Sequence, residues 1–381
     1  MSCPPEPIPL PPHVHLKLSY QLHHTRHLTS RDNPTLDQTL TDSPHILAIV
    51  DDGLAAAQPT FATDLKQKLA AHPGMTGLHI LPAGEASKNT PETLHQILDL
   101  AIDANLCRHS TLVVAAGGAL LDVAGYAAAT LHRGLRLVRI PSTTLAQADS
   151  GVAVKNAINH RGLKNLLGTF HVPHAVINDP TLLASLKPRD FHAGLSEVIK
   201  VALLKDANLF QQVEQLAAEG HITQETTEPL WQRSAHLHAR HILTSGDPFE
   251  TTTARPLDLG HWSAHQLETL SNHRLNHGEA VAIGLALDAH ISHQLGWLTE
   301  YDLQRISRTL AACQLPTTDP LLAQTDSLLA GLETFRQHLG GQLRIPLLAG
   351  IGKPRDAYEL TAHTLRNAID QLTAAEPSHA S

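Results

Sequence analysis

The first half of the chain alternates short apolar runs with amphipathic stretches. The apolar runs HILAIVDDG, LHILPAG, TLVVAAGG, LRLVRIPST and HAVINDP each end in glycine, proline or acidic residues, as buried strands followed by turns do. Between them, residues 61–71 and 91–104 have helical spacing, and Pro91 follows Thr90 as at a helix start. Strands that alternate with helices predict a parallel, doubly wound sheet.

From about residue 180 the strand pattern fades and helical periodicity takes over. The predicted fold class is therefore α/β, with a Rossmann-like NAD-binding domain over residues 1–182 and a mostly α-helical domain over residues 183–381. Residues 1–45 are proline-rich and partly irregular, with one edge strand expected near residues 15–22. In the second half, LRIPLLAG predicts one strand, and helices are expected over residues 189–204, 207–217, 229–244, 261–271, 279–295 and 299–313.

Composition narrows the class of protein. The chain has 381 residues and a formal net charge of −8, and without a basic block it is not expected to bind nucleic acid or an anionic membrane. Its three cysteines are far apart and the start is not a signal peptide, which fits a reducing cytoplasm. The 28 histidines make chance pairs common, so the cluster of His236, His238 and His241 is expected to be a solvated or interface helix face.

The segment VVAAGGALLDVAGY predicts a strand, a tight turn and a helix. Gly117 and Gly118 would let the backbone approach a pyrophosphate at a helix N-terminus. Because the segment lacks the GxGxxG fingerprint, an ordinary turn explains it equally well. Asp51 and the GEASK segment follow two other strands, and the carboxyl ends of parallel strands are where open sheets bind ligands.

The segment IPSTTLAQADSGVAVKNAINHRGLKNLLGTF is mostly small and apolar, yet it holds Asp149, Lys155, Lys164 and Asn165. Burying an unpaired ammonium is costly, and a bound phosphate would supply the missing negative charge. A loop whose lysines point into solvent is the other interpretation, and residue chemistry alone leaves both open.

The run from Gly117 to Gly284 resembles the 3-dehydroquinate synthase family of sugar phosphate cyclases. The family's GGGxxxDxxGF, PTTLLAQxDSSVGGK, GxAEVIK and GHxxGHxxE are similar to AGGALLDVAGY, PSTTLAQADSGVAVK, GLSEVIK and GHWSAHQLE here, and HGEAVAIG is identical. The variant motifs HWSAHQLE, RPLD and DPFE resemble the branch found in bacterial Ebo operons. The resemblance implies a cytoplasmic homodimeric lyase that uses NAD and a divalent metal, Zn2+ or Co2+, on a sugar phosphate.

The resemblance also implies the site residues. Two imidazoles and a carboxylate are a catalytic type of metal set, and the family's ligands correspond to Glu197, His261 and His277. Phosphate would be held by Lys155, Asn165 and His265, helped by Arg133, which a partner subunit can supply. Asp149, Lys164 and Lys200 would orient hydroxyls or the nicotinamide side. The dinucleotide would be held by Asp51, Glu85, Lys88, Gly117, Gly118, Asp122, Ser142 and Thr143.

In the reaction that the resemblance implies, NAD+ transiently oxidises a secondary alcohol, phosphate is eliminated, the hydride returns, and an intramolecular aldol step closes a carbocycle. Against the family pattern, Ala116, Ala153 and Val154 replace glycines, Ala254 stands where 3-dehydroquinate synthases have the arginine for the substrate carboxylate, Asp258 replaces an asparagine, and Arg240 replaces a lysine.

Alanine cannot pair a carboxylate, and Arg255 could do so only if the local register shifted. We therefore expect a non-carboxylated substrate such as sedoheptulose 7-phosphate. The alternatives are 3-dehydroquinate synthase proper, a polyol or alcohol dehydrogenase on the same scaffold, which would release NADH, and a non-catalytic relative.

Overall fold

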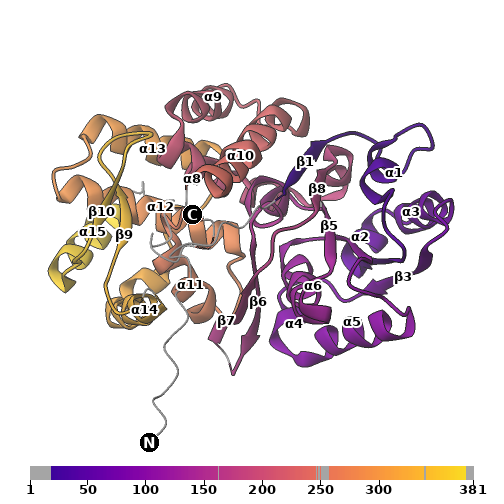
Figure 1. Ribbon diagram of the computed structural model, residues 1–381. Coiled ribbons are helices and arrows are strands. Elements are labelled where there is room, and N and C mark those ends of the chain that lie inside the picture. The colour runs from indigo at the N-terminus through magenta and orange to yellow at the C-terminus, as the bar shows by residue number, and fades with distance from the viewer. Residues whose placement is uncertain are drawn as a thin grey trace, which may run out of the picture.

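The protein consists of a parallel sheet with flanking helices followed by a mostly helical half (Figure 1). The computed structural model describes residues 19–161, 163–245, 247, 249, 257–338 and 340–374. All pairings in the sheet are parallel, in the order β1-β8-β5-β4-β2-β3, which confirms the predicted α/β, doubly wound fold class. The strands are β1 (Gln21–His24), β2 (Ile46–Asp51), β3 (Met75–Leu81), β4 (Thr111–Ala116), β5 (Arg136–Pro141) and β8 (Ala175–Asn178).

Both faces of the sheet are covered, which explains why its strands are continuous apolar runs. In β2, Leu47 and Ile49 belong to the apolar cluster that includes Ile97 of α5, whereas Ile46 and Ala48 belong to the cluster on the opposite face. The helices of this half are α1 (Thr35–Leu40), α2 (Asp52–Ala57), α3 (Phe61–Ala70), α4 (Ala86–Asn89), α5 (Pro91–Asp103) and α6 (Gly118–Thr130).

A two-stranded antiparallel hairpin stands outside the sheet and extends below it in Figure 1. It consists of β6 (Lys155–His160) and β7 (Leu163–Phe170). The sequence did not predict it, because β7 is largely exposed and lacks a buried face. Three short helices flank this region of the chain: η1 (Leu131–Arg133), the π-helical η2 (Ala146–Ser150) and η3 (Pro180–Ser185).

The helical half is organised around α12 (His277–Gln294), of which 14 of 18 residues are buried. A helix that is apolar on all sides is central to a core, and the others surround it (Figure 1). They are α7 (Pro188–Ala193), α8 (Leu195–Lys205), α9 (Ala207–Ala218), α10 (Gln224–Thr244), α11 (His261–Leu270), α13 (Glu300–Ala312), η4 (Pro320–Ala323), α14 (Thr325–His338) and α15 (Ala362–Ala374), with the pair β9 (Ile345–Leu348) and β10 (Pro354–Ala357).

Some predicted boundaries were wrong. The helix expected over residues 189–204 is interrupted at Gly194, where α7 ends and α8 begins. The helix expected from residue 229 begins at Gln224, because Thr223 and Thr226 form a capping box there. The first strand is Gln21–His24, and residues 15–18 lie outside the described residues.

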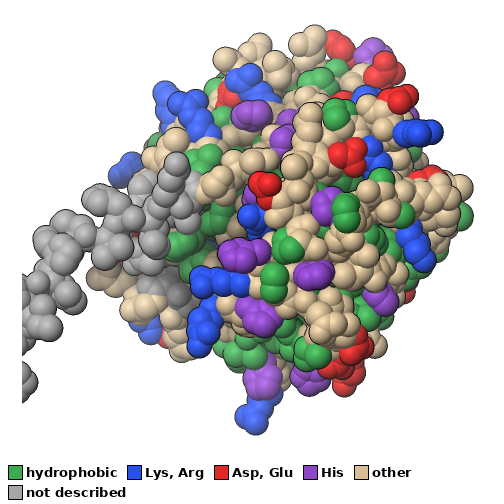
Figure 2. Space-filling model, turned by 45° about the vertical axis from the view of Figure 1, so that its right-hand side comes forward, with side chains coloured by type: hydrophobic (Ala, Val, Ile, Leu, Met, Phe, Trp, Pro, Cys, Tyr) green, Lys and Arg blue, Asp and Glu red, His purple; other side chains and the backbone are tan. Residues whose placement is uncertain are grey.

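The surface view accounts for part of the histidine surplus. Figure 2 shows histidines scattered among charges of both signs on the face that the N-terminal half presents. Within the described ranges, no helix has the combination of length and apolarity needed to cross a bilayer.

Candidate active site

A large cavity lies at the carboxyl ends of the sheet strands and is also lined by the helical half. Its volume is about 980 Å3. Most of the residues singled out in the sequence line it: Asp51, Glu85, Lys88, Gly117, Gly118, Asp122, Ser142, Thr143, Asp149, Lys155, Lys164, Asn165, Lys200, His261, His265 and His277. Glu197 is buried beneath this lining, with 1% of its surface exposed.

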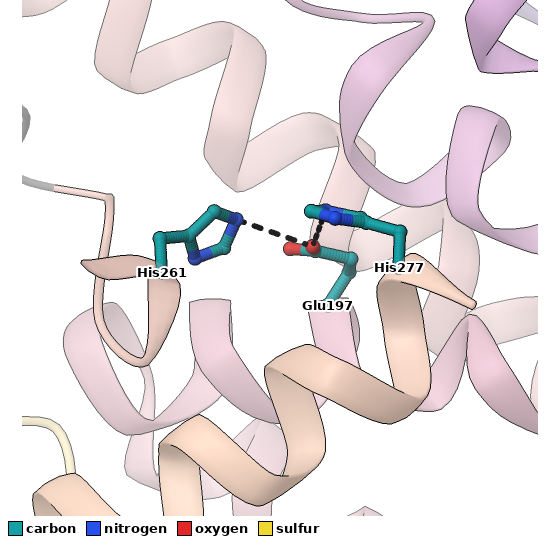
Figure 3. Close-up of side chains that lie close together, drawn as sticks. All are labelled: Glu197, His261 and His277. Carbon is teal, nitrogen blue, oxygen red and sulfur yellow. Dashed lines mark ion pairs between the residues drawn. The ribbon is translucent and has the colours of Figure 1, made fainter. Parts of the chain in front are cut away.

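Three side chains from separate helices converge at the cavity floor. Glu197 comes from α8, and His261 and His277 are the first residues of α11 and α12. Nε2 of His277 lies 3.2 Å and Nε2 of His261 lies 3.5 Å from Oε1 of Glu197 (Figure 3). The potential ligand atoms are all within 4.8 Å of one another, so the group could hold a metal ion.

The electrostatics of this group fit a cation. Neither carboxylate oxygen of Glu197 accepts a hydrogen bond of good geometry among the described residues; Lys200 Nζ lies 2.6 Å from Oε2 as an ion pair. Burial alone would raise the pKa of Glu197, but Lys200 and the two histidines lower it well below its ordinary value. Burial opposes protonation of His277, yet Glu268 and Glu197 raise its pKa to about 10. The buried carboxylates thus attract positive charge to the position where a divalent cation would bind.

Glu268 of α11 supports the group from the far side of His277. One oxygen of Glu268 lies 3.4 Å from Nδ1 of His277, and the other accepts a hydrogen bond of 2.7 Å from Lys164 Nζ. A carboxylate behind a metal-binding histidine fixes which ring nitrogen faces the metal. The hydrogen bond between Lys164 and Glu268 links the hairpin to the helical half, and Lys164 also lies 3.6 Å from Glu85, which precedes α4.

A second chain of charges begins at Lys200, beside Glu197, and lines another part of the cavity wall. Lys200 Nζ donates to Asp149 Oδ2 at 2.7 Å, and the other oxygen of Asp149 contacts Nδ1 of His238. Lys200 is 2% exposed, so it is the buried counter-ion for both Asp149 and Glu197. Such alternation keeps each charge in this wall compensated.

At the carboxyl ends of the strands, the carboxylate of Asp51 fixes the glycine turn that precedes α6. Asp51, at the end of β2, accepts hydrogen bonds from the backbone N–H groups of Gly117 (2.8 Å) and Leu54 (2.5 Å). A side chain at Gly118 would place its Cβ 2.7 Å from Ser150 Oγ. Lys88 Nζ donates to Asp122 at 2.7 Å and to the side-chain oxygen of Asn165 at 2.6 Å. The turn and helix α6 thus present a preformed N-terminus to the cavity, as dinucleotide sites require.

Comparison with known proteins identifies the family. The family model for the 3-dehydroquinate synthase N-terminal domain matches residues 78–193, and that for its C-terminal domain matches residues 194–334. The chain is 36% identical to a 3-dehydroquinate synthase of Thermosynechococcus vestitus over 319 residues, covering 82% of this chain and 86% of that one. The chain belongs to the 3-dehydroquinate synthase family.

Members of this family are sugar phosphate cyclases, and the protein is accordingly a cyclase of the 3-dehydroquinate synthase type, a carbon–oxygen lyase. It is 32% identical over 313 residues to a 2-epi-5-epi-valiolone synthase of Streptomyces glaucescens, covering 79% of this chain and 78% of that one. A solved 2-epi-5-epi-valiolone synthase of Streptomyces hygroscopicus, with NAD+ and Zn2+ bound, has a TM-score of 0.88 and 28% identity, and covers 96% of this chain and 100% of that one.

Some of the residues expected in this family member's site lie elsewhere. Arg133 is in η1, exposed and away from the cavity lining, within a turn in which His132 and Arg133 have positive φ. Ala254 and Arg255 lie outside the described residues. Arg240 is exposed on α10 and does not line the cavity, whereas Asp258 is 8% exposed and does.

The expectation for the histidine cluster on α10 was wrong in part. His236 is exposed and stacks on His24 with ring centroids 5.9 Å apart, but His238 and His241 line the cavity. Burial, reinforced by nearby positive groups, lowers the pKa of His241 to about 4, so it is neutral at physiological pH. Sequence reasoning also missed Glu268, although it is the last residue of the GHWSAHQLE motif.

Proposed function

We propose that this cyclase acts on sedoheptulose 7-phosphate or a similar non-carboxylated sugar phosphate, with NAD and a divalent metal, Zn2+ or Co2+, as cofactors. The observation that carries the proposal is the charge of one cavity wall. The described residues that α10 and the segment after it contribute to this wall include His238, His241, Asp247, Leu257 and Asp258, and no lysine or arginine. Among the described residues of this wall, a substrate carboxylate would meet Asp258 and no lysine or arginine, and burying a carboxylate without a cation costs several kcal/mol.

Both cofactors fit the residues present. Glu197, His261 and His277 would hold the metal, and Asp51, Gly117, Gly118, Asp122, Ser142 and Thr143 would surround the dinucleotide, with Glu85 and Lys88 at its edge. The cofactors would supply Lewis acidity and a reversible hydride acceptor. In this assignment residues 1–182 bind NAD and residues 183–381 carry the metal and much of the substrate site.

The remaining charged residues would bind and orient the substrate. Lysines gather on the hairpin side of the cavity: Lys155 and Lys164 belong to the hairpin, and Lys88 contacts Asn165 there. We assign the phosphate to Lys155, Asn165 and His265, as the family resemblance implies, and the two hairpin lysines supply positive charge to this part of the cavity. Asp149, Lys164 and Lys200 would accept or donate hydrogen bonds to substrate hydroxyls, and their ion pairs hold them in place before the substrate arrives.

Arg133 could reach a substrate only from a second copy of the chain, because its own cavity does not include it. A homodimer therefore remains a prediction. Light scattering of the purified protein tests it, and a monomer at micromolar concentration would remove Arg133 from the assignment.

The direct test is incubation of the protein with NAD+, Zn2+ and each candidate sugar phosphate, followed by a phosphate assay and the mass of the product. Phosphate release from sedoheptulose 7-phosphate without net NADH formation is expected. Release from the carboxylated heptulosonate phosphate alone would identify 3-dehydroquinate synthase proper, and accumulation of NADH would indicate a dehydrogenase. Ala254→Arg should leave turnover of the non-carboxylated substrate no better, and Glu197→Gln should abolish it.

A further inference from the structure

A fully buried arginine lies behind the cavity wall and bonds only neutral groups. Arg139 of β5 has no exposed surface. Its Nη1 donates to the carbonyl oxygens of Gly151 (3.1 Å) and Ala153 (2.6 Å), and its Nη2 donates to the side-chain oxygen of Asn156. Over the described ranges no carboxylate lies within ion-pair distance of it. Burying a guanidinium without a counter-ion is costly. The hydrogen bonds that Arg139 makes to Gly151, Ala153 and Asn156 must therefore serve a purpose that offsets this cost.

The carbonyl between those two is held by a second side chain. Tyr20, just before β1, donates its hydroxyl to Val152 O at 2.6 Å. The next carbonyl, that of Val154, accepts from Asn156 Nδ2 at 3.2 Å and from the backbone N–H of His171 at 2.8 Å. Four consecutive carbonyls, from Gly151 to Val154, are therefore all engaged, which leaves this segment little freedom to shift.

The clamped segment, residues 151–154, lies between two charged residues of the cavity. Asp149 comes just before it and pairs with Lys200, and Lys155 comes directly after it as the first residue of β6. Neither Tyr20 nor Arg139 lines the cavity. Their effect on ligands can act only through the backbone that they hold.

Helix α6 packs against the side chains of Arg139 and Asn156. Gly125 of α6 is so close to them that an added Cβ would lie 1.7 Å from Asn156 Oδ1 and 3.1 Å from Arg139 Nη2. On the other side, Val152 is fully buried against Val176, Ala235 and Ala239. The segment is thus fixed by hydrogen bonds along its carbonyls and by packing on both sides.

We propose that Arg139 and Tyr20 are positioning residues that fix the backbone from Gly151 to Val154 and so hold the Lys155 ammonium in place for the substrate phosphate. This inference rests on the proposed phosphate role of Lys155. Burial alone would make Arg139 a stabilising residue of the fold; the positioning role adds a specific effect on phosphate affinity that passes through Lys155.

The test is a double-mutant cycle on the holoenzyme loaded with NAD+ and Zn2+, with inorganic phosphate as the probe in calorimetry. Tyr20→Phe removes one hydrogen bond and should weaken phosphate binding about 3- to 10-fold, and Arg139→Gln should weaken it further. In a Lys155→Met background, Tyr20→Phe should have no added effect, because the residue that it positions is gone. Arg136→Gln is the matched control: Arg136 lies three residues earlier on β5 and, among the residues that the structure describes, its side chain donates to Asp42 O alone, at 3.2 Å, so the phosphate affinity of this variant should equal that of the wild type.

Tyr20→Phe preserves side-chain volume and carries the test if Arg139→Gln fails to fold. A lowered thermal midpoint with unchanged phosphate affinity in Tyr20→Phe would overturn the proposal, as would full additivity with Lys155→Met. Unchanged phosphate affinity in Lys155→Met alone would instead overturn the phosphate role of Lys155, and the positioning inference with it. Unchanged NAD+ affinity in each variant shows that the glycine turn is intact.

Discussion

Glu268 lies 3.4 Å from Nδ1 of His277, on the side of the imidazole ring away from the Glu197 carboxylate, which is 3.2 Å from Nε2. The ring is therefore held between two buried acids. Nε2 could bind a metal only if Nδ1 carries the ring proton and directs it toward Glu268. Glu268 can therefore test the proposed metal site without a change to Glu197, His261 or His277.

Replacing Glu268 by Gln should raise the dissociation constant for Zn2+ about 10- to 100-fold, because the amide orients the ring less strongly. Competition with a chromophoric chelator measures the constant. Glu300→Gln is the control, since it changes a solvent-exposed glutamate that also faces a histidine, with His293 Nε2 at 3.2 Å. Equal Zn2+ affinity in wild type and Glu268→Gln would remove Glu268 from the metal site.

Replacing Lys200 by Met should destabilise the metal-free protein more than the Zn2+-loaded protein. The change leaves two buried carboxylates, Asp149 and Glu197, without their common counter-ion, a defect that typically costs about 3–5 kcal/mol. A bound divalent cation would restore part of the positive charge beside Glu197. Scanning calorimetry with and without Zn2+ measures both midpoints, and Lys205→Met, at the exposed end of α8, should change neither. An equal loss in both forms would contradict the prediction.

Asp288 of α12 predicts a specific pH dependence of stability. It accepts hydrogen bonds from the Gly260 N–H (2.7 Å) and from Trp262 Nε1 (2.8 Å), on either side of His261. Burial raises its pKa to about 7, and these hydrogen bonds only partly oppose the shift. Between about pH 4 and pH 7 the folded state therefore binds more protons at this group than the unfolded state, so its contribution to stability falls as pH rises.

The variant Asp288→Asn removes this titration. The stability of the metal-free wild type relative to Asp288→Asn should decline from pH 5 to pH 7, by at most about 1.4 kcal/mol per unit. Thermal midpoints across this range provide the measurement. Asp326→Asn, at a 93% exposed side chain, should follow the wild type at every pH. Parallel curves for wild type and Asp288→Asn would show that Asp288 does not titrate in this range.

Replacing Gly125 by Ala should destabilise the protein by about 1–3 kcal/mol, because the new methyl group would overlap the Asn156 amide held by Arg139. The thermal midpoint measures the effect. Gly331→Ala introduces the same methyl into α14, where the nearest atoms, at 2.9–3.0 Å, belong to the partly exposed and flexible Gln266 side chain, and it should cost less. An equal or smaller loss of stability in Gly125→Ala would mean that the side chains of Asn156 and Arg139 move aside for the new methyl group.

Physical signals in the sequence account for what could be predicted. The strands of the sheet were found because residues such as Leu47 and Ile49 belong to unbroken apolar runs, which burial on both faces requires. The convergence of Glu197, His261 and His277 came from resemblance, since spacing alone cannot bring together residues from three helices. The hairpin was missed because β7 is mostly exposed.

The missed site residues had weaker signals. His238 was expected on a solvated or interface helix face, because chance pairs are common among 28 histidines, whereas the structure places it in the cavity lining, in contact with Asp149. Arg139 lies within the apolar run LRLVRIPST, and the sequence analysis did not single it out, because two of its acceptors are backbone carbonyls that no side-chain pattern records.

The order of the ligands along the chain has a consequence for biosynthesis. The last strand of the sheet ends at Asn178, before any of the three side chains that we propose as metal ligands, and His277, the last of them, begins the central helix α12. A nascent polypeptide can therefore complete its nucleotide-type half on the ribosome while it is still unable to chelate an ion. Under the proposed function, metal binding would therefore be a late event of synthesis that follows folding of the helical core.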